Sequence, residues 1–150
     1  MKVVILENIR SAYNVGNVVR TADALGWNVW IVGYTPSPLD HPKVKKTSLG
    51  AEETVNLKQF DFTPDAIKEA KKIGMTVIAA ELDTHAANLG EFVPETQDIA
   101  VIFGNEVEGV IPDTLSAVDQ IVQIPMRGKK ESLNIGQSAA IFMWELGGKK

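Results

Sequence analysis

The chain has 150 residues and a formal net charge of −4, with 45% hydrophobic residues, 23% charged residues and no cysteine. This length is that of one domain with a sizeable core, and the missing cysteines exclude disulfides and thiolate metal sites. The negative charge argues against a protein that coats nucleic acid by bulk electrostatics. No apolar run approaches the roughly 20 residues of a membrane helix, so we expect one cytoplasmic domain over residues 1–150.

The first part of the chain alternates strand-like and helix-like segments. Residues 3–6 are a continuous apolar run bounded by charge, which predicts a strand buried on both faces. Apolar residues recur at helical spacing over 14–25, with Asn14 as the expected N-cap and a glycine directly after the helix. Residues 29–32 predict a second strand. The proline-containing stretch 34–51 predicts a long loop with a functional role.

The second part continues the alternation. The predicted segments are a short strand at 54–57, a helix at 65–73, strands at 75–80 and 99–103, a helix at 112–118, a strand at 120–124 and a last helix at 135–146. Strands separated by helices predict an α/β fold with a mainly parallel sheet and helices on both faces. The last helix is apolar nearly all round, which is typical of a central core helix or of one partly covered by a partner subunit.

A glycine-rich turn follows the strand at 99–103. Gly104 and Gly109 have the spacing of a phosphate-binding P-loop, but two apolar residues stand where its lysine and hydroxyl residue belong. No Gly-x-Gly-x-x-Gly follows the first strand either, which weakens a dinucleotide site. The turn carries Glu106 and Glu108, which as a pair are also typical of an ordinary solvated turn.

Polar residues at two helices are further candidates for a site. Arg20 lies in a mostly apolar helix, where it suits bidentate recognition of phosphate or carboxylate, or an ion pair with Asp23. Ser132 and Asn134 directly precede the last helix, and either side chain can cap it. Loops of this kind at successive strand ends converge at one edge of a parallel sheet, where open α/β proteins bind ligands.

Positive charge gathers in three places on an acidic chain. The clusters are Lys43, Lys45 and Lys46; Arg127, Lys129 and Lys130; and Lys149 with Lys150. Such clusters suit contacts with a few phosphates, although each alone is equally typical of a solvated loop. The two histidines, His41 and His85, have no metal-ligand spacing, so we expect no metal site.

Three motifs in order resemble the SpoU (TrmH-type) RNA 2′-O-ribose methyltransferases of the SPOUT superfamily. The first motif spans 14–23, the second spans 102–109, and the third runs from 124 to 126 and continues at Ser132-Leu133-Asn134. The segment 46–52 also looks familial. The resemblance implies a C-terminal trefoil knot, an S-adenosylmethionine site, a homodimer and methyl transfer to a ribose 2′-hydroxyl of tRNA or rRNA.

The resemblance also implies roles for particular residues. Arg20 would be the catalytic arginine, assisted by Asn14, Glu106, Ser132 and Asn134. The implied cofactor-binding residues are Phe103, Gly104, Asn105, Glu106, Gly109, Ile124, Met126, Ser132 and Leu133. The expected RNA-binding residues are Arg10, Arg20, Lys43, Lys45, Lys46, Arg127, Lys129 and Lys130.

Two other functions stay open. The chain fits a non-catalytic RNA-binding dimer that retains the cofactor pocket, which cofactor binding without turnover would indicate. It also fits a generic nucleotide-binding domain, although the usual glycine fingerprint is missing. The sequence leaves open which RNA and which nucleotide are modified.

Overall fold

The computed structural model describes residues 1–148 of the protein. Within these residues, seven parallel strands form a central sheet. The third basic cluster, Lys149 with Lys150, lies outside the described residues. The strands are β1 Lys2–Glu7, β2 Asn28–Val32, β3 Leu57–Phe60, β4 Thr76–Ala80, β5 Ala87–Asn88, β6 Ile99–Phe103 and β7 Gln120–Gln123. Their order across the sheet is β3-β2-β1-β6-β4-β7-β5, and each neighbouring pair is parallel. The predicted parallel sheet is confirmed.

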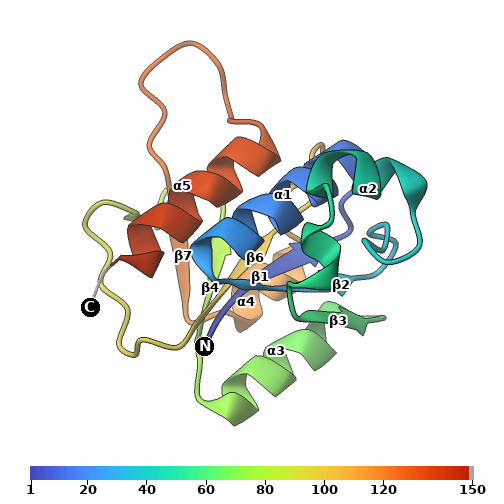
Figure 1. Ribbon diagram of the computed structural model, residues 1–150. Helices are drawn as coiled ribbons and strands as arrows, with labels where there is room; N and C mark the ends of the chain where they lie inside the picture. The colour runs from blue at the N-terminus through green and yellow to red at the C-terminus, as the bar shows by residue number, and fades with distance from the viewer. Residues whose placement is uncertain (149–150) are drawn as a thin grey trace.

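Helices cover both faces of this sheet, as predicted (Figure 1). The helices are α1 Ala12–Leu25, α2 Pro42–Ser48, α3 Thr63–Ile73, α4 Pro112–Ala117 and α5 Ile135–Gly147, with a 3-10 turn, η1, at Ala51–Glu53. α1, α2 and α5 lie on one face, and α3 and α4 lie on the other. No helix among the described residues is long and apolar enough to cross a membrane.

The central strand β1 contributes to both halves of the core. Val4 and Leu6 pack in the cluster beneath α1 and α5, whereas Val3 and Ile5 pack in the cluster on the α3 side. Successive side chains of a strand point to opposite faces, so a strand covered on both faces needs an unbroken apolar run. This requirement explains why the apolar run of β1 predicts a strand.

The prediction of a loop over 34–51 is wrong in its second half, which contains α2 and η1. α2 begins with Pro42, a favourable first helical residue, and buries Val44 and Ser48 four positions apart. Seven residues give too few turns for a clear helical period. The helix leaves Lys43, Lys45 and Lys46 exposed.

α2 packs closely on α1 because Gly16 has no side chain. A Cβ at Gly16 would lie 1.8 Å from Thr47 Oγ1 and 2.4 Å from the carbonyl oxygen of Val44. Thr47 Oγ1 also lies within hydrogen-bond distance of the Tyr13 carbonyl oxygen, at 3.1 Å. The lysine-bearing helix is therefore held at a fixed place on the first helix.

Two strand predictions also need correction. The short strand predicted at 54–57 lies further along, at Leu57–Phe60, because residues 54–56 continue the turn after η1. β5 was not predicted, since its two residues carry no period. Both segments lie at the edges of the sheet, where partial burial leaves no continuous apolar run.

The prediction that Asn14 caps the first helix is wrong. α1 begins earlier, at Ala12, and its N-cap is Ser11, whose side chain accepts a hydrogen bond from the Asn14 backbone N–H at 3.2 Å. Both residue types cap well, so the sequence alone does not choose between them. The Asn14 side chain is consequently available for other contacts.

Candidate functional site

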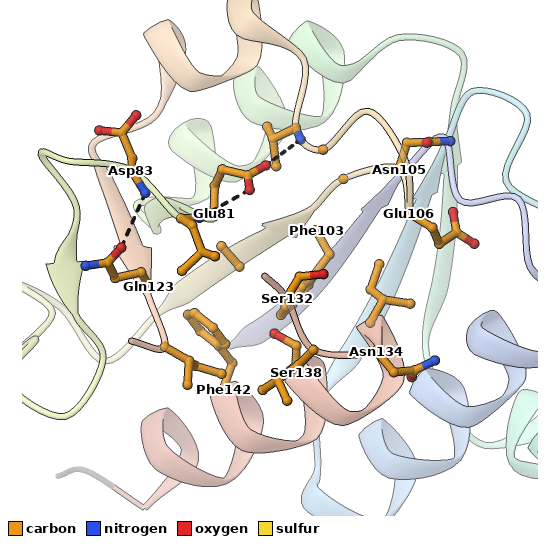
Figure 2. A pocket seen from close by; sticks show the side chains of 18 of the residues that line it. Glu81, Asp83, Phe103, Asn105, Glu106, Gln123, Ser132, Asn134, Ser138 and Phe142 are labelled. Carbon is orange, nitrogen blue, oxygen red and sulfur yellow. Dashed lines mark hydrogen bonds between the residues drawn. The ribbon is translucent and has the colours of Figure 1, made fainter. Parts of the chain in front are cut away.

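A cavity of about 690 Å³ opens at the carboxyl ends of β6, β4 and β7, next to α5. Figure 2 shows Glu81, Phe103, Asn105, Glu106, Ser132 and Asn134 among the side chains around it. The sheet direction places the loops after these strands at a single edge. Their convergence confirms that the segments selected from the sequence meet in space.

The turn Gly104–Gly109 forms one wall of the cavity. Asn105 and Gly109 exchange backbone hydrogen bonds of 3.2 and 2.9 Å, and the Asn105 side-chain oxygen accepts from the N–H groups of Val107 and Glu108. A Cβ at Gly104 would lie 2.3 Å from the Gly109 carbonyl carbon and from the Val110 nitrogen. The turn folds back on itself so closely that only glycine fits at position 104.

Glu106 fastens this turn to the loop after β1. Its two carboxylate oxygens accept the backbone N–H groups of Arg10 at 2.9 Å and Ser11 at 2.7 Å. Desolvation by burial raises the pKa of Glu106. The hydrogen bonds from Arg10 and Ser11 lower the pKa, as do interactions with the backbone of Glu106 itself and with the Asn14 side chain, and together they outweigh the effect of burial. The pKa lies below its ordinary value of 4.5, so the group is a carboxylate at neutral pH.

Asn134 connects the start of α5 to α1. It is the N-cap of α5, and its Oδ1 accepts the N–H groups of Gly136 at 2.9 Å and Gln137 at 3.4 Å. Its Nδ2 donates to Asn14 Oδ1 at 3.2 Å. Between the two capping candidates that the sequence left open, the structure selects Asn134 rather than Ser132.

The structure brings most of the predicted site residues together. The predicted cofactor residues that line the cavity are Phe103, Gly104, Asn105, Glu106, Gly109, Ile124, Met126, Ser132 and Leu133, and the predicted catalytic residues Asn14 and Asn134 line it too. Arg20 is the one predicted catalytic residue outside the lining.

Arg20 is exposed on α1, and its guanidinium makes no ion pair or hydrogen bond with residues 1–148. The alternative of an ion pair with Asp23 is wrong, because the Asp23 carboxylate instead accepts from the Thr54 hydroxyl at 2.6 Å. A permanently charged group without a protein partner is available to bind an anion.

The other predicted RNA-binding residues lie on three separate segments of the chain. Lys43, Lys45 and Lys46 are exposed on α2. Arg127, Lys129 and Lys130 are exposed on the segment between β7 and α5, and Arg10 is exposed after β1. None of these basic residues lines the cavity.

Sequence reasoning missed Glu81, which follows β4 directly. Its Oε2 accepts the Val110 N–H at 2.9 Å, its Oε1 accepts the Leu82 N–H at 3.2 Å, and a Cβ on Gly109 would lie 2.4 Å from Oε2. Glu81 thus supports the far end of the Gly104–Gly109 turn (Figure 2). A polar residue directly after a buried strand was the signal that could have identified it.

The remaining unpredicted lining residues include Asp83, Gln123, Ser138 and Phe142. The Gln123 side-chain oxygen accepts the Asp83 N–H at 3.3 Å, which joins the segments after β4 and β7. Within residues 1–148, no group of three or more histidine, aspartate or glutamate side chains is placed to hold a metal ion.

Residues 1–144 match the model of the SpoU rRNA Methylase family. The chain belongs to this family. A similar relative is the tRNA (guanosine(18)-2′-O)-methyltransferase of Thermus thermophilus, 33% identical over 95% of this chain and 72% of that protein. The 23S rRNA (guanosine(2553)-2′-O)-methyltransferase of Bacillus subtilis is 28% identical over 98% of this chain and 58% of that protein. The SpoU family thus includes relatives that extend well beyond the length of this chain.

Two solved structures share the fold. A structure described for the 2-OH methylation of C/U34 on tRNA has a TM-score of 0.85 and 28% identity, covering 97% of this chain and 93% of that chain. An AdoMet-bound rRNA methyltransferase from Sinorhizobium meliloti has a TM-score of 0.89 and 24% identity, covering 97% of this chain and 55% of that chain. At that identity the second structure supports the fold alone.

Proposed function

We propose that this SpoU-family protein transfers a methyl group from S-adenosylmethionine to a ribose 2′-hydroxyl of tRNA or rRNA. The carrying observation is that Asn14, Glu106 and Asn134 come from three segments distant in the chain and meet at one cavity. Asn134 is hydrogen-bonded to Asn14, and Glu106 to the N-cap of the helix that carries Asn14. Family membership and the named reactions of the relatives support the same chemistry. Residues 1–150 would carry this activity as one domain. The cytoplasm, where tRNA and rRNA function, stays the predicted location.

The cavity fits S-adenosylmethionine in size and in the chemistry of its wall. Its volume of about 690 Å³ lies within the roughly 300–1,000 Å³ of small-molecule sites. Apolar side chains suit an adenine ring, and several carboxyl groups suit a positively charged ligand. The residues that would hold it are Phe103, Gly104, Asn105, Glu106, Gly109, Ile124, Met126, Ser132 and Leu133.

When bound, S-adenosylmethionine supplies a methyl group activated by its positive sulfur. The protein's task is then mainly to hold the ribose in line with that group. We assign this orientation to Asn14, Ser132 and Asn134, whose side chains lie at the cavity. Glu106 fixes the loop that precedes α1 through its bonds to the N–H groups of Arg10 and Ser11, and so positions Asn14.

Arg20 would bind the phosphate next to the target ribose and stabilise the negative charge that develops on the 2′-oxygen. Its guanidinium is unpaired within the described residues, and an arginine guanidinium carries a permanent positive charge. A bidentate guanidinium matches phosphate geometry. We therefore assign Arg20 to anion binding, with the hydroxyl proton leaving through water.

RNA would be held by the basic residues that lie outside the lining of the cavity. Lys43, Lys45 and Lys46 project from α2, whose position is fixed on α1, whereas Arg127, Lys129 and Lys130 belong to the segment before α5. Because the net charge is −4, binding depends on these local contacts rather than on bulk attraction. RNA affinity would fall steeply with salt.

We also infer that the chain after β7 forms the trefoil knot that the family resemblance implies. β7 lies beyond β4 in the sheet, whereas α5 returns to pack beside α1, and the long loop of residues 124–134 connects the two (Figure 1). In a crystal structure, we expect the backbone closed through its ends to reduce to a trefoil. An unknotted trace would contradict this inference.

A homodimer through α5 is the second structural proposal. Trp144 is 71% exposed and Ile141 is 43% exposed, and both line an apolar groove of about 430 Å³ with Leu89, Ile124 and Pro125. Burial of such a face is favourable. Light scattering should give twice the chain mass for the wild type and the chain mass for Trp144→Glu, with Phe62→Glu as the exposed-aromatic control. A monomeric wild type would contradict the dimer.

The function is tested by calorimetric binding of S-adenosylmethionine and by transfer of its labelled methyl group to unmodified tRNA and to unmodified rRNA. We expect binding and label in one of the two RNA fractions. Binding without label in either fraction would favour the alternative, a non-catalytic RNA-binding dimer. Preferential binding of a dinucleotide would favour a generic nucleotide-binding domain.

A further inference from the structure

Tyr34 is an exposed ring whose hydroxyl is fixed. It follows β2 at the carboxyl edge of the sheet, and 60% of its surface is exposed. Its hydroxyl oxygen accepts a hydrogen bond from Asn105 Nδ2 at 2.9 Å, and Asn105 itself is only 7% exposed. An exposed aromatic ring normally rotates freely, so this anchored ring is preorganised for contact with another flat group.

The backbone beneath the ring is rigid as well. The Gly33 N–H donates to the Phe60 carbonyl at 3.0 Å, and a Cβ on Gly33 would lie 1.9 Å from Asn8 Oδ1. The next residue, Thr35, is buried, and its hydroxyl oxygen accepts the Ile9 N–H at 3.0 Å. Tyr34 therefore stands on a short segment that is held on both sides by the ends of β1 and β3.

The partner of Tyr34 belongs to the wall of the cofactor cavity. Asn105 Nδ2 also donates to the Asn8 carbonyl at 2.9 Å, while its Oδ1 accepts the N–H groups of Val107 and Glu108. One buried amide thus holds the Gly104–Gly109 turn and the tyrosine together. In the sheet, β1 and β6 lie between β2 and the strands β4 and β7 that frame the cavity. Tyr34 accordingly lies across this turn from the cavity.

We propose that Tyr34 is a substrate-binding residue on which an unpaired base of the RNA, next to the methylated nucleotide, stacks. This proposal rests on the proposed function and deepens it by naming the recognised chemistry, a single-stranded nucleotide with its base turned out. Sequence-specific RNA recognition commonly stacks such bases on aromatic side chains, and stacking tolerates any base. The exposed Arg10, whose N–H is held by Glu106, supplies positive charge on the neighbouring loop.

The test compares Tyr34→Ala with Tyr34→Phe in steady-state methyl transfer to the RNA fraction that the wild type modifies. Tyr34→Ala removes the ring and should raise KM for RNA about 5- to 100-fold, the range measured for lost base stacking. Tyr34→Phe keeps the ring and should stay within about 3-fold of the wild type. Calorimetry should give an unchanged Kd for S-adenosylmethionine in both variants. Phe62→Ala, an exposed aromatic after β3, is the control and should leave KM unchanged.

Two results would overturn the stacking role. An unchanged KM for RNA in Tyr34→Ala would exclude the contact. Equal losses in both variants, together with weaker binding of S-adenosylmethionine, would assign Tyr34 only a supporting role through its hydroxyl.

If the wild type transfers no methyl group, the proposed function fails separately. In that case the anisotropy of labelled tRNA and rRNA still decides, since a stacking Tyr34 requires weaker binding in Tyr34→Ala than in Tyr34→Phe.

Discussion

The side-chain amides of Asn14 and Asn134, separated by 120 positions in the chain, are joined by a hydrogen bond of 3.2 Å. Asn134 uses its oxygen to cap α5 and its nitrogen to hold Asn14. Because Glu106 accepts the N–H of Ser11, the N-cap of α1, the first helix, the last helix and the Gly104–Gly109 turn form one connected unit at the cavity. A change at one of these side chains should therefore affect the others.

Asn134→Ser separates the capping role of Asn134 from its bond to Asn14. Serine caps helices about as well as asparagine, so we expect the free energy of unfolding to change by less than about 0.5 kcal/mol. Methyl transfer should fall, because serine lacks the amide that reaches Asn14. Asn134→Ala should lose transfer and also about 1 kcal/mol of stability, measured by urea unfolding. Full activity in Asn134→Ser would show that the bond to Asn14 is dispensable.

Arg20→Ala should reduce methyl transfer by at least about 100-fold, as expected when a donor to developing negative charge is removed. The affinity for S-adenosylmethionine should not change, because Arg20 does not line the cavity. Arg20→Lys should have intermediate activity, since it keeps the charge but not the bidentate geometry. Lys68→Ala, an exposed lysine on α3, is the matched control. Normal turnover in Arg20→Ala would rule out the assigned role.

The lowered pKa of Glu106 predicts how its contribution to stability depends on pH. A carboxyl group with a lower pKa in the folded state stabilises the fold above its unfolded pKa of about 4.3. That stability is lost as the pH falls through the lower, folded value. The wild type should exceed Glu106→Gln by about 1 kcal/mol near pH 7, allowing for the solvent exposure of the side chain. A difference of equal size near pH 3, in urea titrations, would contradict this.

The central fold could be predicted because its strands are buried on both faces. β1 and β6 are continuous apolar runs, and α1 has enough turns to show its period. α2 and β5 could not be predicted, since seven and two residues are too short for a pattern. Short elements acquire their structure from packing, as α2 does against Gly16.

The site was predictable as a set of loops but not as a set of contacts. Two neighbouring residues, Ser11 and Asn14, both suit an N-cap, and only the course of the backbone decides that Ser11 takes it. Glu81 follows a buried strand as a single acidic residue, which marks it as a candidate but does not by itself separate a site residue from a solvated strand end. Its bond to Val110, directly after the Gly104–Gly109 turn, depends on β4 and β6 being neighbours, which the order along the chain does not reveal.

Glu81→Ala should weaken S-adenosylmethionine binding about 5- to 10-fold, the effect of roughly one hydrogen bond in the cavity wall. The substitution removes the acceptor for the Val110 N–H and leaves the end of the turn unsupported. Calorimetry measures the change directly. Glu91→Ala, an exposed carboxyl that does not line the cavity, should bind as the wild type does. Unchanged binding in Glu81→Ala would mean that the turn needs no support from β4.

The central claim is ribose methylation, and analysis of the labelled RNA after alkaline hydrolysis tests it most directly. Alkali cleaves RNA through the free 2′-hydroxyl, so a 2′-O-methylated nucleotide survives in an alkali-resistant dinucleotide. We predict that labelled tRNA or rRNA yields the label in such dinucleotides, and that Arg20→Ala yields none. Label released in mononucleotides, which would indicate base methylation, or the absence of label in both RNAs would contradict the account.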